Sequence, residues 1–360
     1  MNIDSSVKDN MNAAVLMEAN NVKIKEVNTP MPDSEDVLIK VEACALCSSD
    51  ISLIDKPFPG QPPYGNFIIG HEYAGTVVGV GDNVDEFNIG DRVAVEAHLG
   101  CMRCANCRIG DYTSCLNYGN TKKGHRANGF TTNGCFAQYV INHINTVHKI
   151  SDSIQFDEAA LISNLGCSLY GFDTLGGYFV GDKVVVIGPG PLGLIAAQVS
   201  KALCADRTFL VGTREERLEV GNRLGIDRII NIHKENPLSV INKETNGIGA
   251  DIVIESSGTE SGLDLAVNAT KRNGKILLLG FPHKKIEFDF ENLALNNKII
   301  YTVRGDGKSN VKRAVSLLKN RKVNLKALVT HSYPLSQFSE AVRVYTGRVD
   351  NAIKVIIKPN

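Results

Sequence analysis

The sequence predicts an α/β protein with one mostly-β domain and one domain built on a doubly wound parallel sheet. The chain has 360 residues, which is more than the roughly 250–300 at which a single hydrophobic core stops growing. From Asn12 to about His148, short β-like runs alternate with turns, whereas after about Leu165 apolar strands alternate with helical segments. The second pattern is typical of βαβ units and therefore of a parallel sheet.

The individual elements follow from the same periodicities. In the first region the clearest strands are Asp36–Cys44, Ala74–Val80 and Arg92–Ala97. In the second region they are Lys183–Ile187, Thr208–Val211, Asp251–Ile254 and Lys275–Leu279. Near the end, Asn310–Lys319 looks helical and Ala352–Ile357 reads as a closing strand. We expect residues 1–10 to be a polar tail, residues 11–164 and 301–360 to form the mostly-β domain, and residues 165–300 to form the parallel-sheet domain.

Composition and charge favour a protein that binds small molecules. Lys+Arg and Asp+Glu both number 39, so the sequence lacks the basic excess that nucleic acids or anionic membranes attract. The polar start resembles no signal peptide, and no apolar run approaches the 18 residues of a membrane span. Nine cysteines, four of them within 15 residues, suit metal binding in a reducing compartment. We expect a cytoplasmic protein.

A dinucleotide motif opens the second region. The strand Lys183–Ile187 runs into Gly188-Pro-Gly190-Pro-Leu192-Gly193, and the apolar helical run Leu194–Ser200 follows. In this context the glycines permit a tight turn, backbone approach to a pyrophosphate and close packing of helix on strand. The motif predicts a Rossmann domain with cofactor contacts from Gly188, Gly190, Leu192 and Gly193.

The end of the next strand bears on the choice of cofactor. An acidic residue there would bind the ribose hydroxyls of NAD and repel a 2′-phosphate. Here the residues are Gly212, which makes room, Thr213, which can donate a hydrogen bond, and Arg214, which can pair with a phosphate. They favour NADP over NAD, although Glu215 and Glu216 follow directly and leave NAD open.

Four cysteines form the first candidate metal site. Cys101, Cys104, Cys107 and Cys115 have the spacing CxxCxxCx₇C, in a lobe that spans about residues 98–118. Four thiolates complete a tetrahedral zinc site without an open position, which is typical of structural zinc. An iron–sulfur cluster, which needs other spacing and a nearby proline, and a metal-free group of thiols are the alternatives.

The second candidate site is dispersed. Cys47-Ser48-Ser49-Asp50 and Gly70-His71-Glu72 contribute a thiolate, an imidazole and a carboxylate, which suit a zinc ion with an open position for water or substrate. Each motif alone is weak evidence for a metal site, because a single histidine is usually structural. Cys44 and Cys47 also fit a redox CxxC motif or two core cysteines.

These pieces together resemble a known family. Gly70-His71-Glu72-x-x-Gly75, followed by Gly81 and Val84, is similar to the signature of the zinc-containing medium-chain alcohol dehydrogenases, and the resemblance covers nearly the whole chain after Met11. Within that family the chain looks most like the sorbitol and threonine dehydrogenases, at residues 303–304 and 323–334. The resemblance implies a GroES-like catalytic domain beside the Rossmann domain.

The resemblance also implies roles for individual residues. Cys47 and His71 would bind a catalytic zinc with Glu72 beside them, Ser49 would hydrogen-bond the reacting oxygen and pass its proton, and Asp50 would orient His71. Arg304 would face the polar part of the substrate or cofactor. Two zinc ions per chain, one catalytic and one structural, are therefore expected. Relatives commonly form dimers or tetramers through their nucleotide domains, for which Lys275–Leu279 and Ile286–Phe290 are candidate edge strands.

The chain departs from the family pattern at two places. Members usually supply a further Cys, Asp or Glu near the catalytic zinc, but the corresponding residue here is Ser163 or Asn164, with Cys167 as a remote substitute. A histidine that often follows the zinc cysteine is replaced by Ser52. The uncharged segment leaves Cys47, His71 and Glu72 as the expected ligands.

The sequence thus favours a zinc-dependent oxidoreductase that transfers a hydride between a secondary alcohol, of the polyol, cyclitol or sugar-alcohol type, and NAD(P). The alternatives are a threonine-type 3-dehydrogenase acting on a β-hydroxy amine and a non-catalytic, zinc-stabilised nucleotide-binding protein.

Overall fold

The computed structural model describes residues 2–176, 180–282, 284–307 and 310–360, which form two compact units. Unit 1 comprises Met1–Gly166, Gly305–Asn320 and Val329–Asn360, and unit 2 comprises Cys167–Arg304 and Arg321–Leu328. The first boundary falls inside helix α4 (Ile162–Thr174). Residues 301–304 and 321–328 lie in unit 2, although we expected them in the mostly-β domain. Residues 165–166 lie in unit 1, although we expected them in the parallel-sheet domain.

Unit 1 is mainly β-structure, as its alternating sequence predicts. Its strands are β1 (Asn2–Ile3), β2 (Asn10–Glu18), β3 (Asn21–Asn28), β4 (Asp36–Ala45), β5 (Phe67–Ile68), β6 (Glu72–Val80), β7 (Arg92–Val95), β8 (His98–Leu99), β9 (Arg126–Ala127), β10 (Tyr139–His143), β11 (Val147–Lys149), β18 (Val329–Pro334) and β19 (Lys354–Lys358). Its helices are α1 (Ser48–Asp55), α2 (Ala105–Arg108), α3 (Phe156–Ala159), α10 (Asn310–Lys319) and α11 (Phe338–Gly347), together with the start of α4.

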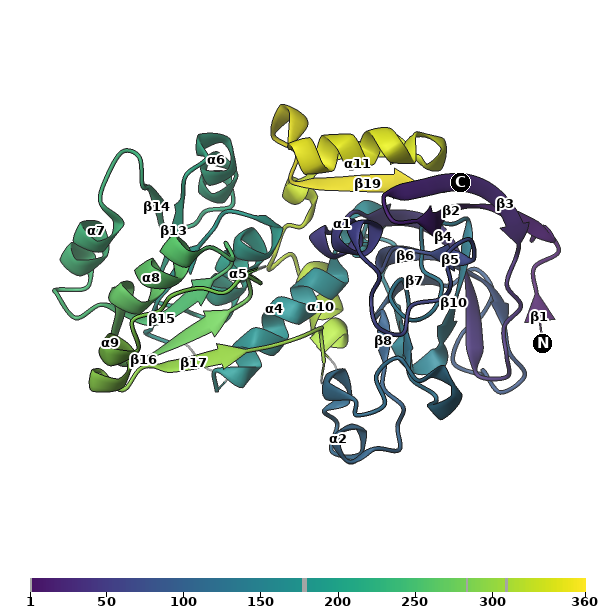
Figure 1. The fold of residues 1–360 in the computed structure, drawn as a ribbon, viewed down its shortest axis with the longest axis horizontal. Helices are drawn as coiled ribbons and strands as arrows, with labels where there is room; N and C mark the ends of the chain where they lie inside the picture. Colours follow the sequence, from purple (N-terminus) through teal and green to yellow (C-terminus); the bar gives the residue numbers. More distant parts are fainter. Residues whose placement is uncertain (1, 177–179, 283, 308–309) are drawn as a thin grey trace. The chain divides into compact units, whose positions relative to one another are not determined.

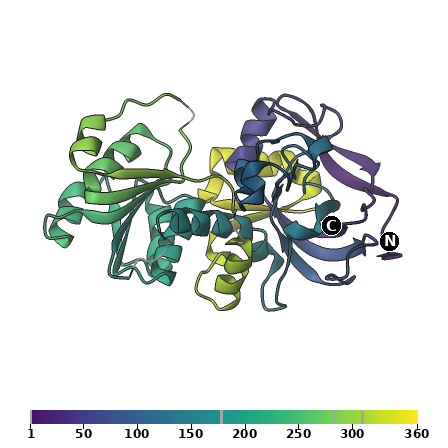
Figure 2. The ribbon, with the colours of Figure 1, turned by 90° about the horizontal axis from the view of Figure 1, so that it is seen from below.

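The main sheet of unit 1 joins distant parts of the sequence. Its strand order is β11-β7-β6-β4-β19-β18, with β1 on β6 and β10 on β4. Strand β19 pairs antiparallel with β4, so that the yellow C-terminal segment lies beside the first strands of the chain (Figures 1 and 2). Residues 1–10, expected to be only a polar tail, contain β1, whose Asn2 and Ile3 pair with Val80 and Gly79.

One motif glycine is explained by this sheet. A Cβ atom at Gly75 would lie 2.0 Å from the carbonyl oxygen of Lys40 on the neighbouring strand β4. Any side chain there would therefore push β4 and β6 apart. The glycine of the GHExxG pattern keeps together the two strands that carry Cys44 and Glu72 at their ends.

Unit 2 is a parallel sheet with helices between its strands, which confirms the predicted alternation. Its elements are β12 (Lys183–Ile187), α5 (Pro191–Ala202), β13 (Arg207–Gly212), α6 (Glu215–Arg223), β14 (Arg228–Asn231), α7 (Pro237–Glu244), β15 (Ala250–Glu255), α8 (Glu260–Ala269), β16 (Thr270–Leu278), α9 (Phe290–Leu295) and β17 (Ile299–Thr302). The strand order is β14-β13-β12-β15-β16-β17. From β12 the chain first adds strands on one side of the sheet and then, from β15 on, adds them on the other side. Dinucleotides bind at this kind of switch point.

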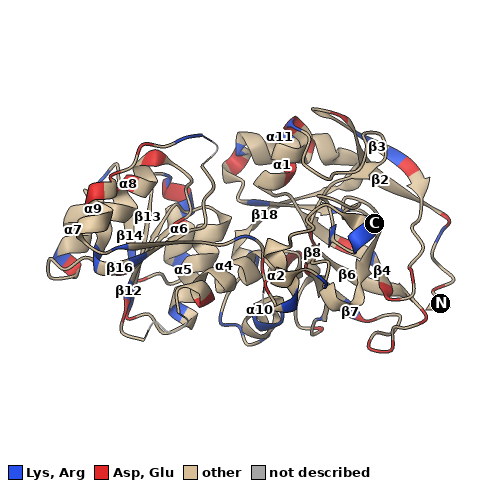
Figure 3. Ribbon diagram, turned by 60° about the horizontal axis from the view of Figure 1, so that its bottom comes forward, with Lys and Arg blue, Asp and Glu red and all other residues tan. Residues whose placement is uncertain are grey.

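Each unit has its own apolar core. In unit 1 the core includes the fully buried Phe67, Tyr73 and Phe136, and in unit 2 it includes Val185, Phe209 and Ile276. Burial of each such side chain stabilises a fold by about 1.5–3 kcal/mol. Basic and acidic residues are interspersed along the elements of both units (Figure 3). Of the helices in the described ranges, none is long and apolar enough to cross a bilayer.

Candidate catalytic and structural metal sites

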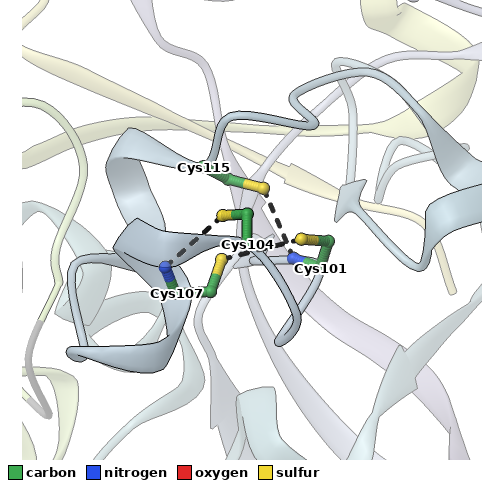
Figure 4. A group of neighbouring side chains, drawn as sticks. All are labelled: Cys101, Cys104, Cys107 and Cys115. Atoms are coloured by element: carbon green, nitrogen blue, oxygen red, sulfur yellow. Dashed lines mark hydrogen bonds between the residues drawn. The ribbon is translucent and has the colours of Figure 1, made fainter.

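The four-cysteine lobe brings its thiols together. Cys101, Cys104, Cys107 and Cys115 offer sulfur atoms that all lie within 4.8 Å of one another, around the short helix α2 (Figure 4). The backbone N–H of Cys101 donates to Cys115 Sγ at 3.4 Å, and Asn117 Nδ2 donates to Cys101 Sγ at 3.1 Å. The expected group of four thiols is therefore present. Four soft sulfur donors are a ligand set that zinc prefers.

The thiols differ in how readily they ionise. Burial alone would raise the pKa of Cys101, but hydrogen bonds from Asn117 and from backbone N–H groups outweigh it and lower this pKa to about 6. Burial raises the pKa of Cys107 to about 12 and also raises that of Cys115. Without a cation the cluster is thus partly protonated, and metal binding would release protons from it.

The second site is built where helix α1 faces the start of β6. Cys47, His71 and Glu72 offer ligand atoms within 4.8 Å of one another, a juxtaposition of residues 24 and 25 positions apart in the sequence. Cys47 is the N-cap residue of α1, and Ser49 Oγ lies 3.7 Å from its sulfur. One soft thiolate, one imidazole and one carboxylate form a donor set that fits Zn²⁺ with an open position.

Asp50 links two of these ligands. Its Oδ2 accepts a hydrogen bond from the backbone N–H of Cys47 at 2.9 Å, and its Oδ1 lies 3.0 Å from His71 Nδ1. Because an ionised carboxylate can only accept, Nδ1 carries the proton and Nε2 keeps its lone pair for a metal. Burial alone would lower the pKa of His71, but the Asp50 carboxylate outweighs burial and raises this pKa well above its usual value.

Two side chains, those of Asn164 and Lys354, hold the Glu72 carboxylate, and neither contact was predicted from the sequence. Asn164 Nδ2 donates to Glu72 Oε1 at 2.7 Å, and the ammonium of Lys354 contacts Glu72 Oε2. Glu72 and Lys354 are both almost fully buried, and Lys354 also donates to the carbonyl oxygen of Leu46 at 3.3 Å. Burial would lower the pKa of Lys354, but the Glu72 carboxylate raises it above its usual range. Sequence alone gave no signal for Lys354, which lies on β19 far along the chain.

The two uncharged residues in the first turn of α4 contact different carboxylates. Asn164 reaches Glu72, whereas Ser163 Oγ donates to Asp306 Oδ2 at 2.8 Å. Asp306 is buried, and burial raises its pKa to about 6. Burial, reinforced by the charge of Asp306, raises the pKa of the neighbouring Glu96 well above its usual value. Neither acid was among the residues singled out from the sequence.

The dinucleotide motif has the expected geometry in unit 2. Gly190 is the N-cap residue of α5, and a Cβ atom there would meet nothing within 4 Å. A Cβ atom at Gly193 would lie 1.9 Å from the carbonyl oxygen of Gly188. Leu192 lies in the first turn of α5. The motif therefore combines a crowded helix–strand contact at Gly193 with open space for a phosphate beside Gly190.

Just after β13, the first acidic residue of helix α6, Glu215, is paired with residues of unit 2. Glu215 pairs with Lys234 at 2.8 Å, and Asn231 donates to its other oxygen at 2.6 Å. Hydrogen bonds from Lys234 and Asn231 lower the pKa of Glu215. Thr213 is exposed and Arg214, the N-cap residue of α6, is half-buried. Arg304 is exposed just after β17 in unit 2.

The chain is similar to known proteins over most of its length. Residues 33–152 match the family model described as alcohol dehydrogenase GroES-like domain, and residues 191–320 match that described as zinc-binding dehydrogenase. The chain is 32% identical to a sorbitol dehydrogenase of Halalkalibacterium halodurans, over 93% of this chain and 95% of that protein. It is 34% identical to an L-threonine 3-dehydrogenase of Pyrococcus abyssi, over 91% of this chain and 94% of that protein.

A solved structure extends the likeness to the fold. An Escherichia coli oxidoreductase/dehydrogenase of unknown specificity, involved in membrane biogenesis, has a TM-score of 0.90 at 27% identity. The alignment covers 97% of this chain and 99% of that one.

Proposed function

This chain belongs to the zinc-dependent medium-chain alcohol dehydrogenase family, and we propose that it transfers a hydride between a polyol, cyclitol or sugar-alcohol type of secondary alcohol and NADP. The convergence of Cys47, His71 and Glu72 carries this proposal. Three protein ligands would leave the fourth position of a tetrahedral zinc ion open for a substrate oxygen. This favours a catalytic role over a purely structural, non-catalytic one.

In the proposed mechanism the residues of unit 1 position the reacting groups. A zinc ion held by Cys47, His71 and Glu72 would act as a Lewis acid that lowers the pKa of the alcohol. The Asp50 carboxylate binds Nδ1 of His71, so the lone pair on Nε2 stays free for a metal. Lys354 offsets the charge of Glu72. Ser49, whose hydroxyl lies beside Cys47, would accept the proton of the substrate hydroxyl while releasing its own proton to water.

We infer the cofactor from unit 2. Gly188, Gly190, Leu192 and Gly193 would receive the pyrophosphate at the start of α5. Because Lys234 and Asn231 already bind the Glu215 carboxylate and partly offset its charge, Gly212, Thr213 and Arg214 would receive a 2′-phosphate. A cofactor held there would supply the nicotinamide ring as the hydride acceptor, and Arg304 would contact the polar part of the cofactor or substrate.

The metal content follows from the two thiol-containing sites. We propose two zinc ions per chain, with the structural one bound by Cys101, Cys104, Cys107 and Cys115. The balanced charge of the chain is compatible with a cytoplasmic enzyme that acts on small molecules, which is the location that we propose.

We also propose a homodimer or homotetramer formed through unit 2, but not by the strands first considered. The segment Lys275–Leu279 lies largely in β16, which is paired on both sides by β15 and β17. Residues 286–289 form no strand, and Phe290 begins α9. Within the described sheet the outer strand next to this region is β17, where Ile299 is half exposed, so β17 is the better candidate for pairing with a second copy.

A threonine-type 3-dehydrogenase is the second candidate, because the Pyrococcus abyssi relative bears that name. A panel of polyols, cyclitols, sugar phosphates and L-threonine, each tested with NAD⁺ and NADP⁺, separates the two. We expect turnover with polyol-type alcohols and a preference for NADP⁺ that Arg214→Ala removes. Turnover confined to L-threonine would favour the second candidate, and no turnover with any alcohol would contradict both.

A further inference from the structure

A buried carboxylate in unit 1 is joined to the Cys47–His71–Glu72 site by two consecutive residues. At the start of α4, Ser163 donates to Asp306 at 2.8 Å and its neighbour Asn164 donates to Glu72 at 2.7 Å. The two side chains thus hold two carboxylates, one of which belongs to the candidate metal ligands. Asp306 lies close enough to His71 and Glu72 for its charge to interact with both.

The local packing is built to admit Asp306. A Cβ atom at Gly166 would lie 3.0 Å from the Cβ of Asp306 and 3.2 Å from Val311, so a glycine at this position lets residues 305–307 approach α4 closely. The buried carboxyl group of Glu96 lies close enough for its charge to interact with that of Asp306. Asp306 is 3% exposed, so water does not stabilise its negative charge.

In the metal-free protein, protonated His71 is a positive charge that acts on this carboxylate, and that charge is lost when the imidazole becomes a neutral metal ligand. Among the described residues, no lysine or arginine forms an ion pair with Asp306, and Lys354 is already engaged by Glu72. A buried carboxylate without a counter-charge is strongly destabilising. A divalent cation at the neighbouring ligands would provide that counter-charge.

We propose that Asp306 is a positioning carboxylate of the Cys47–His71–Glu72 metal centre, anchored by Ser163 and contributed by residues 305–307. It increases the affinity of the centre for a divalent cation through its charge, and it fixes the start of α4 so that Asn164 stays on Glu72. This inference rests on the proposed function only in assigning a metal to these ligands. The segment at Ser163 carries no negative charge of its own, and Asp306 supplies one there from a different part of the chain.

Cobalt binding tests this role without turnover. The full-length protein is dialysed against a chelator until one zinc ion per chain remains, and Co²⁺ is then added while the thiolate-to-cobalt and d–d absorption bands are followed. We expect Asp306→Asn to weaken Co²⁺ binding about 10–100-fold, as loss of an outer partner of a metal ligand commonly does, and to shift the d–d bands. Ser163→Ala, which keeps the carboxylate but removes its anchor, should weaken binding less.

Two further variants make the test specific. Glu340→Gln, which removes a half-exposed negative charge from helix α11 of the same unit, should bind Co²⁺ like the wild type. The double variant Ser163→Asp/Asp306→Ser exchanges the two partners of this hydrogen bond, so a carboxylate is again present, and we expect it to recover most of the Co²⁺ affinity. It also keeps the test decisive if Asp306→Asn folds poorly.

The inference is overturned if Asp306→Asn folds and binds Co²⁺ with wild-type affinity and spectrum, or if the double variant binds Co²⁺ no better than Asp306→Asn does. A wild-type protein that takes up no second metal would overturn it together with the proposed metal centre. A protein that binds Co²⁺ at Cys47 but oxidises no alcohol would contradict the proposed function alone, and the relative cobalt affinities would still decide the role of Asp306.

Discussion

At the scale of single residues, the candidate site is a set of charges that balance one another in a buried place. Glu72 and Lys354 are each 1–2% exposed and form an ion pair, while Asp50 supports His71. In water such pairs would contribute little, but in a buried site the loss of one partner leaves a charge without compensation. The positions of these residues therefore depend on one another.

The first prediction concerns Lys354. Lys354→Met leaves the Glu72 carboxylate buried and unpaired, and we expect it to lower the free energy of unfolding by about 3–5 kcal/mol in protein freed of the catalytic metal. The double variant Glu72→Gln/Lys354→Met should recover most of the loss, because no buried charge remains. Urea unfolding measures both. A loss of less than about 1 kcal/mol in the single variant, the range of an exposed ion pair, would show that this pair is accessible to water.

A second prediction concerns the pH dependence of His71 in the same metal-free protein. Burial lowers and the Asp50 carboxylate more strongly raises the pKa of His71, so the folded-state pKa lies above the unfolded value of about 6.5. Protonated His71 then stabilises the fold fully below the unfolded pKa, and this contribution is lost as pH rises through the folded pKa. In Asp50→Asn the NMR titration of His71 should move to lower pH. A midpoint that stays in place would mean that Asp50 does not control this histidine.

At the scale of elements, helix starts carry the functional groups of both units. Cys47 caps α1, Asn164 lies in the first turn of α4 and Gly190 caps α5. Each position leaves backbone N–H groups near a place where negative charge is expected. The motif that opens α5 is the best example, because its two glycines meet different surroundings.

This contrast gives a matched pair of variants. Gly193→Ala places a Cβ against the carbonyl oxygen of Gly188 and should separate α5 from β12, lowering the thermal unfolding temperature of unit 2. Gly190→Ala meets open space, so the fold should be unchanged, while NADP binding weakens about tenfold or more because the methyl group occupies the phosphate site. Calorimetry and fluorescence titration separate the two effects. Equal stability of both variants would contradict the packing role of Gly193.

At the scale of the whole molecule, the sequence predicted the local patterns well and the long-range partners poorly. Strand β4, helix α10 and the βαβ succession follow from periodicity, and the four-cysteine spacing already defines one site. The hydrogen bond and the ion pair of Glu72 could not be predicted, because both depend on the tertiary fold. The start of α4 brings Asn164 to Glu72, and the pairing of β19 with β4 brings Lys354. Asp306 was missed for the same reason. Residues that are ordinary in sequence become functional only when the sheet brings them together.

The pairing of the C-terminal strands with the first sheet also makes a prediction about truncation. Removal of Lys354–Asn360 deletes β19, which lies between β4 and β18, and with it the cation that offsets Glu72. We expect the shortened chain to lose the cooperative unfolding of unit 1 in calorimetry. Retention of that transition, with normal metal content, would show that the first sheet is complete without its C-terminal strand.

The central claim is that Cys47, His71 and Glu72 bind a catalytic zinc ion distinct from the one in the four-cysteine lobe. Zinc analysis of the wild type and of Cys47→Ser, together with alcohol-dependent reduction of NADP⁺, tests it most directly. We predict two zinc ions per wild-type chain, and one zinc ion and no measurable turnover in a Cys47→Ser variant that remains folded. A Cys47→Ser variant that keeps both zinc ions and the wild-type rate would contradict the account.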